Sequence, residues 1–116
     1  MSRLYLAGPY RAIHPYLVEE NVAKHRKAAA LLTMMGFSVF SPILNSHPIA
    51  GCVPEERFLE CDLEWLRVSQ LLVLLPSWEQ SEGSRVEKRE AELCGIRVYV
   101  WPNDREVLER EAKASE

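Results

Sequence analysis

Glu87 is the carboxylate of this chain whose surroundings most favour a chemical role. It follows the segment Ser81–Val86, a Gly-Ser turn placed after a strongly apolar run, and this segment predicts the start of a helix from about 84 to 94. Glu87 would then lie in the first turn and share a face with Ala91 and Cys94, which should pack on a sheet. A lone first-turn glutamate usually only complements the helix dipole. Its expected place near the carboxyl end of a strand, where such sheets bind ligands, favours a chemical role instead.

The turn after the first predicted strand holds a second group of polar residues. Gly8 permits close backbone approach or a positive φ, Tyr10 lies on the loop, and Arg11 can meet an anion. Taken alone, Gly8-Pro9-Tyr10-Arg11 is more simply a tight turn after a strand that carries an ordinary core tyrosine, Tyr5. The glycine spacing of a dinucleotide-binding turn is absent, so we expect no nicotinamide and no other cofactor.

Asp62 and His47 are candidates for proton transfer. Asp62 lies in a helix that Pro54 can open, at the edge of the apolar stripe that begins at Leu59, and a solvated aspartate is the simpler interpretation. His47 lies in a loop-like segment from 41 to 53, where a histidine without a role is an equally good interpretation. Trp78, which follows the third strand, either lines a base pocket by stacking or covers the edge of the sheet.

Strands alternate with helices along the chain. The predicted order is strand 3–7, helix 17–35 ended by Gly36, strand 37–40, loop 41–53, a helix from 54, strand 71–75, helix 84–94, strand 96–100, and a last helix with a capping box of Asn103 and Glu106. The charged tail after Arg110 is expected to fray. This order predicts an α/β fold with a single domain over residues 1–116, a doubly wound parallel sheet in a flavodoxin- or Rossmann-like three-layer sandwich. Ligands bind such sheets at the carboxyl ends of the strands.

Composition excludes several classes of protein. Hydrophobic residues make up 47% of the 116 residues, enough for the core of one domain. A net charge of −3 gives no support for nucleic-acid binding, and no apolar run has the length of a membrane span. The amino-terminal sequence lacks the layout of a signal peptide, so a cytoplasmic protein is expected. Cys52, Cys61 and Cys94 match no zinc or redox spacing, which favours buried or idle thiols and no metal.

Three motifs, in this order, resemble those of nucleoside 2-deoxyribosyltransferases and deoxynucleoside 5′-monophosphate N-glycosidases. They cover most of the chain from residue 3 to about 102, and they are Tyr5-Leu6-Ala7-Gly8-Pro9-Tyr10, Asp62-Leu63-Glu64-Trp65-Leu66 and Ser81-x-Gly83-Ser84-x-x-Glu87-x-x-x-Ala91. The resemblance implies that Glu87 is a nucleophile, that Asp62 contacts the base or handles a proton, and that Tyr5 orients the nucleophile. Ser81 stands where the transferases often carry aspartate and the nucleotide hydrolases often carry serine.

The chain departs from this superfamily at several positions. Gln70 stands where an aspartate is common before the third strand, and Lys88-Arg89 replaces the Leu-Gly that often follows the nucleophile. The segments 41–53 and 78–81 also differ, which points to a separate branch whose substrate the resemblance does not supply.

A chemically coherent function follows from these residues. An ionised glutamate can trap the sugar when an N-glycosidic bond breaks, as in retaining glycosidases, and a helix start should favour that anion. Asp62 or His47 could give a proton to the leaving base. Water as acceptor makes the protein a hydrolase, and a second base makes it a transferase. The alternative is a non-catalytic module that binds a nucleotide or sugar phosphate on the same fold, and a pure scaffold is least favoured.

Two further expectations concern binding and assembly. A 5′-phosphate could be held by one guanidinium and by the hydroxyls and backbone N–H groups of a helix start, namely by Arg11, Ser81, Gly83 and Ser84. The helix around Asp62 carries Phe58, Trp65 and Leu66, more apolar surface than one sheet face covers. Small relatives also complete their sites with a neighbouring subunit, so the resemblance and this surface together predict a homo-oligomer.

Overall fold

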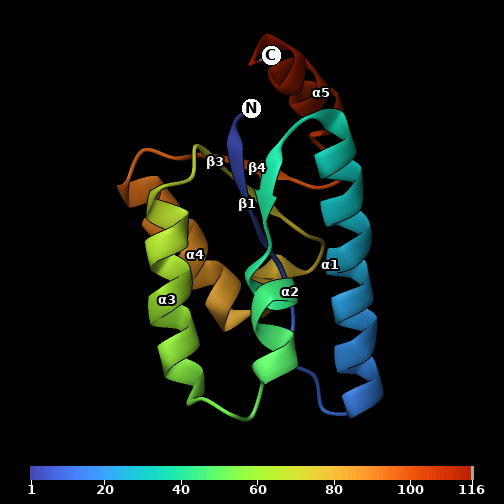
Figure 1. Ribbon diagram of the computed structural model, residues 1–116, viewed down its shortest axis with the longest axis vertical. Helices are drawn as coiled ribbons and strands as arrows, with labels where there is room; N and C mark the ends of the chain where they lie inside the picture. The colour runs from blue at the N-terminus through green and yellow to red at the C-terminus, as the bar shows by residue number, and fades with distance from the viewer. Residues whose placement is uncertain (116) are drawn as a thin grey trace.

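A four-stranded parallel sheet forms the middle layer of the molecule. The computed structural model describes residues 1–115 and pairs the strands in the order β2-β1-β3-β4 (Figure 1). The strands are β1 (Arg3–Ala7), β2 (Ser38–Phe40), β3 (Leu71–Leu74) and β4 (Arg97–Val100). The predicted doubly wound parallel sheet is confirmed, and each later strand is one residue shorter than expected.

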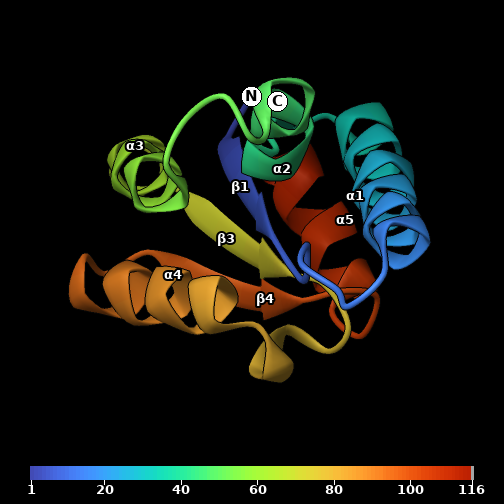
Figure 2. The ribbon, with the colours of Figure 1, turned by 90° about the horizontal axis from the view of Figure 1, so that it is seen from below.

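Helices cover both faces of this sheet, as the predicted three-layer sandwich requires. Figure 2 shows the sheet edge-on between these helices. One face carries α1 (Pro15–Met35) and α5 (Arg105–Ala114), and the other carries α3 (Glu55–Arg67) and α4 (Glu82–Leu93). Gly36 ends α1 at a φ of 117°, a conformation that favours glycine, as the sequence predicted.

Strand alternation decides which side chains enter which half of the core. On β1, Leu4 and Leu6 pack into the cluster beneath α1 and α5, whereas Tyr5 packs into the cluster beneath α3 and α4. All three side chains are fully buried, and truncating such a leucine to alanine costs about 2–5 kcal/mol. The pleat of β1 therefore fixes Tyr5 on the face of the sheet that α3 and α4 cover.

The segment from 41 to 53 is not the loop that the sequence predicted. It contains a short helix, α2 (Pro42–Ser46), followed by a 3₁₀ turn, η1 (His47–Ile49). The Ser41 hydroxyl accepts a hydrogen bond from the Leu44 N–H at 3.2 Å and caps α2. A serine cap followed by proline in the first turn is a helix-start signal, and the run was too short for periodicity to reveal it.

The end of the chain also differs from expectation. The predicted capping box of Asn103 and Glu106 is wrong, because α5 begins at Arg105 and the Asp104 carboxylate instead accepts a hydrogen bond from the Val100 N–H at 2.7 Å. The predicted fraying after Arg110 is wrong up to Ala114, where α5 ends. Burial of Leu108 and Ala112 holds this helix against the sheet. Glu116, the last residue of the predicted domain and tail, lies outside the described residues.

Cys52, Cys61 and Cys94 are all exposed and form no disulfide within residues 1–115, so of the two alternatives, buried or idle thiols, burial is wrong. Over the same range, no helix combines the length and apolar character needed to cross a membrane. No group of three or more His, Cys, Asp or Glu side chains in the described part of the chain is arranged to hold a metal ion.

Candidate active site

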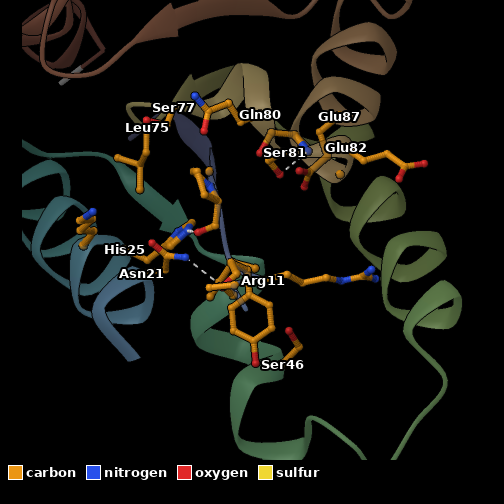
Figure 3. Close-up of a pocket in the computed structure, with 18 of the residues that line it drawn as sticks. Arg11, Asn21, His25, Ser46, Leu75, Ser77, Gln80, Ser81, Glu82 and Glu87 are labelled. Carbon is orange, nitrogen blue, oxygen red and sulfur yellow. Dashed lines mark hydrogen bonds between the residues drawn. The ribbon is translucent and has the colours of Figure 1, made fainter. Parts of the chain in front are cut away.

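A cleft opens at the carboxyl ends of β1 and β3, where the strand order reverses direction. The turn after β1 and the segment after β3, residues 75–77, line it, and its volume is about 1100 Å³. This is the place where doubly wound sheets bind ligands. Figure 3 shows the origins of the lining residues: Ser81, Glu82 and Glu87 come from the start of α4, His25 and Asn21 from α1, and Ser46 from α2.

Gly8 allows the two loops at the cleft floor to approach each other. A Cβ atom at Gly8 would lie 2.7 Å from the Cβ atom of Leu75, a separation that no alanine could hold without backbone movement. The Leu75 N–H donates to the Ala7 carbonyl at 2.9 Å and ties the same loops together. Of the two reasons that the sequence offered for glycine here, close approach is the one that the structure supports.

Glu87 lies buried at the edge of this cleft, with 7% of its surface exposed. The Tyr5 hydroxyl donates a hydrogen bond to Glu87 Oε2, which joins the central strand to α4. Of the two serines that could cap this helix, Ser81 and Ser84, Ser81 is the cap, with its hydroxyl accepting from the Ser84 N–H at 3.2 Å. The helix begins at Glu82, so Glu87 lies in the second turn rather than the first. Cys94 is exposed and does not pack on the sheet as predicted.

Burial governs the ionisation of Glu87. Desolvation raises its pKa to about 8, while the hydrogen bond from Tyr5 lowers it and the charge of Asp62 raises it further. This direction runs against the expectation that the helix start keeps Glu87 ionised at neutral pH. The dipole effect fades beyond the first turn, and Glu87 lies past that turn.

Asp62 and Tyr5 respond to the same buried environment. Burial raises the pKa of Asp62 to about 6. The pKa of Tyr5 is strongly raised, first by burial and then by the charges of Glu87 and Asp62. The charge of Asp62 is among the causes that raise the pKa of Glu87, so the two carboxyls are electrostatically coupled. Of the two, Glu87 has the higher pKa and keeps its proton to higher pH.

Most of the residues singled out in the sequence line the cleft. They are Gly8, Pro9, Tyr10, Arg11, Asp62, Ser81, Gly83, Ser84 and Glu87. Tyr5 lies beneath this surface and reaches the site through Glu87. Arg11 forms an exposed ion pair with Glu55, at 2.6 Å, so a bound phosphate would have to compete for its guanidinium.

His47 and Trp78 are not among the lining residues. His47 contacts the cleft through Tyr10, whose hydroxyl lies 2.7 Å from His47 Nδ1, and both ring nitrogens of His47 are engaged. Trp78 packs against the hydrophobic cluster beneath α3 and α4, with the Lys88 ammonium 5.5 Å from its ring centroid. Of the two interpretations of Trp78, the structure supports the one in which it covers the sheet, because its ring packs against the hydrophobic core.

Sequence reasoning missed two residues of α1 that hold the turn after β1. His25 is fully buried and its Nε2 lies 3.1 Å from the Pro9 carbonyl oxygen, while the Asn21 side chain donates to the Tyr10 carbonyl at 3.0 Å. Burial lowers the pKa of His25, which keeps the ring neutral. The helical spacing that placed His25 among apolar residues was visible in the sequence, but its partner in the loop was not.

Unpartnered polar atoms also gather at the cleft. In the described residues, two buried side-chain atoms lack a hydrogen-bond partner, His25 Nδ1 and Ser84 Oγ, and both residues line the cleft.

Gln70, the departure from the superfamily before β3, accepts a hydrogen bond from the Arg3 N–H at the opposite end of β1. This departure in sequence therefore lies at the end of the sheet opposite the cleft.

The sheet order and the two helical layers are shared with solved structures of 2-deoxyribosyltransferases. A solved 2-deoxyribosyltransferase from Bacillus psychrosaccharolyticus matches with a TM-score of 0.66 at 23% identity, over 85% of this chain and 71% of that one. A 2-deoxyribosyltransferase from Leishmania mexicana matches with a TM-score of 0.62 at 17% identity, over 86% and 63% respectively. The chain thus spans less than two thirds of the Leishmania protein. Identities this low establish the shared fold alone.

The chain belongs to the family described as a domain of unknown function, DUF4406, whose sequence profile matches residues 2–100. This range includes all three sequence motifs and ends with β4. No curated protein matches the chain in sequence.

Proposed function

We propose that this protein is an enzyme that acts on the N-glycosidic bond of a nucleoside or a nucleoside 5′-monophosphate, with Glu87 as its nucleophile. The observation that carries the proposal is the buried hydrogen bond from Tyr5 to Glu87, at the edge of a cleft that Asp62 also lines. A buried carboxylic acid with a strongly raised pKa, beside a second perturbed carboxyl in a cleft, is typical of a catalytic site.

The residues support a two-step reaction. In the first step a carboxylate oxygen of Glu87 attacks the anomeric carbon, the C–N bond breaks, and the base leaves with the electron pair of that bond. Asp62 gives the base its proton, so the reactive form has Glu87 ionised and Asp62 protonated. Because the pKa of Glu87 is the higher of the two, this form is the minor one of the carboxyl pair. In the second step water or another base attacks the anomeric carbon, the bond to Glu87 breaks and its carboxylate is released, and Asp62, ionised after the first step, takes the proton of the attacking molecule.

Tyr5 has a distinct part in this scheme. Its hydroxyl donates to one oxygen of Glu87, which leaves the other oxygen for the sugar. The same bond lowers the pKa of Glu87 and so favours the ionised nucleophile against the effect of burial. Because Tyr5 is fully buried in the core, the orientation that it gives to Glu87 is rigid.

The alternative function is a non-catalytic module that binds a nucleotide or a sugar phosphate. Glu87 is buried and Asp62 is half-buried, and neither carboxyl supplies the positive charge that a pure phosphate site uses. Their convergence therefore favours the enzyme over the binding module. A binding module would be expected to hold a phosphate without consuming any nucleoside.

The test is to incubate the protein with a panel of nucleosides and their 5′-monophosphates and to measure free base. The wild type should release base from at least one of them, and Glu87→Gln should release none while it still binds the same compound. Glu92→Gln, on the same helix but exposed and outside the cleft, is the matched control and should keep full activity. Equal release by the wild type and Glu87→Gln would rule out this nucleophile.

A further inference from the structure

Three side chains from separate elements form a hydrogen-bonded chain at the rim of the cleft. The Tyr10 hydroxyl lies 2.7 Å from His47 Nδ1, and His47 Nε2 lies 3.0 Å from Glu19 Oε1. Tyr10 belongs to the turn after β1 and lines the cleft, His47 begins η1, and Glu19 lies on α1. The reaction proposed above uses none of these contacts.

The order of partners assigns a direction to each hydrogen bond. A carboxylate oxygen of Glu19 accepts, so His47 donates from Nε2–H. In the tautomer that carries its hydrogen on Nε2, Nδ1 has a lone pair, which accepts the hydrogen of the Tyr10 hydroxyl. Burial, followed by the charges of Glu19 and Glu55, raises the pKa of Tyr10, so that hydrogen is present at neutral pH.

Hydrogen bonds to the backbone hold the segments that carry Tyr10 and His47 in place. The Asn21 side chain donates to the Tyr10 carbonyl at 3.0 Å, and the Ser46 hydroxyl donates to the Pro42 carbonyl at 2.8 Å just before His47. The rings of Tyr10 and His47 meet edge to face, with centroids 5.6 Å apart and planes inclined at 76°. The Tyr10 hydroxyl is therefore not a free rotor that could turn its hydrogen towards a ligand.

We propose that Tyr10 is a specificity-determining residue that offers the ligand only oxygen lone pairs, and that the cleft selects ligands which present an N–H or O–H donor at this point. This inference rests on the proposed function, because the ligand is taken to be a nucleoside or its monophosphate. The donor is either an exocyclic amino group of the base or a hydroxyl group of the sugar. His47 and Glu19 are positioning residues, since they act through Tyr10.

Binding to the non-hydrolysing Glu87→Gln protein tests the proposal separately from catalysis. In the base arm, 2′-deoxyadenosine is compared with 2′-deoxyinosine, and 2′-deoxycytidine with 2′-deoxyuridine, because each pair exchanges an amino donor for a carbonyl acceptor. In the sugar arm, 2′-deoxyadenosine is compared with its 3′-O-methyl and 5′-O-methyl ethers, which can only accept. Dissociation constants are measured by titration calorimetry.

The added substitution His47→Phe keeps the ring but removes the acceptor, so that the Tyr10 hydroxyl becomes free to donate. We expect a donor preference of about tenfold or more in one arm, falling to about twofold with His47→Phe. Tyr10→Phe should give the same loss of preference. His14→Phe is the matched control, since His14 is exposed and stacks on Tyr16 away from the cleft, and it should keep the preference.

The arm that responds identifies the donor as base or sugar. The proposal is overturned if His47→Phe changes no ratio in either arm, or if the starting protein prefers acceptors, which a doubly protonated His47 would produce. Contacts of the protein to the ring nitrogens of the base are the same with and without His47→Phe, so they cancel when the two proteins are compared. If no nucleoside or monophosphate binds any of these proteins, the proposed function itself fails, whereas binding without a response to His47→Phe removes only this inference.

Discussion

Tyr5 and Glu87 are 82 residues apart in the chain, yet the tyrosine hydroxyl donates directly to the glutamate carboxyl inside the protein. The contact joins the middle of the central strand to the second turn of α4. It brings together a buried acid, its hydrogen-bond donor and, through electrostatic coupling, a second carboxyl at Asp62.

Glu87→Gln should stabilise the protein at alkaline pH. The pKa of Glu87 rises from 4.5 to about 8 on folding, so between these values the native state holds a proton that the unfolded state has lost. Wild-type stability therefore falls as the pH rises through this window, whereas a glutamine stays neutral. At pH 9 the variant should gain on the order of 3–5 kcal/mol relative to the wild type, and at pH 5 much less. Urea unfolding at both values measures the difference, and identical pH dependence of the two proteins would contradict it.

Tyr5→Phe should lower the plateau of the pH–activity profile and move its alkaline limb to higher pH. The hydrogen bond from Tyr5 lowers the pKa of Glu87, so its loss raises that pKa. Because Glu87 has a higher pKa than Asp62, the form with Glu87 ionised and Asp62 protonated becomes rarer, and its alkaline limb follows the pKa of Glu87. The profile of kcat/KM for base release is the measurement. Tyr99→Phe is the control, because Tyr99 donates to Glu111 in a comparable pair outside the cleft. A uniformly lower rate with an unmoved limb would mean that Tyr5 only supports the fold.

A nucleoside 5′-monophosphate should raise the melting temperature more than the corresponding nucleoside. The start of α4 offers the Ser81 and Ser84 hydroxyls, backbone N–H groups, and open space at Gly83, where a Cβ atom would meet nothing within 4 Å. Gly83→Ala should therefore fold, gain about 0.5–1 kcal/mol of helix stability, and lose the extra shift due to the phosphate. Equal shifts for nucleoside and monophosphate in the wild type would remove the phosphate from this site.

The protein should associate through α3, as its sequence suggested, but by fewer residues than expected. Leu66 is fully buried within the chain and Phe58 lines the cleft, which leaves Trp65, 56% exposed and stacked on Phe40, together with Val68, 52% exposed. Trp65→Arg should shift a dimer towards monomer in sedimentation velocity. A wild type that stays monomeric at every concentration would contradict the prediction.

The sequence by itself determined the order of strands and helices and several of their ends. The run Leu71–Leu75 predicted a buried central strand, Gly36 predicted the end of α1, and Ser81 predicted the cap of α4. These features depend on neighbours within a few residues, on periodicity, capping and backbone freedom, so a local pattern is enough to predict them. Local pattern also marked Glu87 as a candidate, although it placed that residue one turn too early.

Only the tertiary structure decided how the site works. The direction of the pleat placed Tyr5 on the face that α4 covers, and the depth of burial set the pKa of Glu87 against the expected effect of the helix start. The partner of His47 and the burial of Trp78 were equally beyond local reasoning, because each depends on segments distant in the sequence. Desolvation and long-range hydrogen bonds arise from the packing of whole layers, and no spacing of residues along the chain encodes their magnitude.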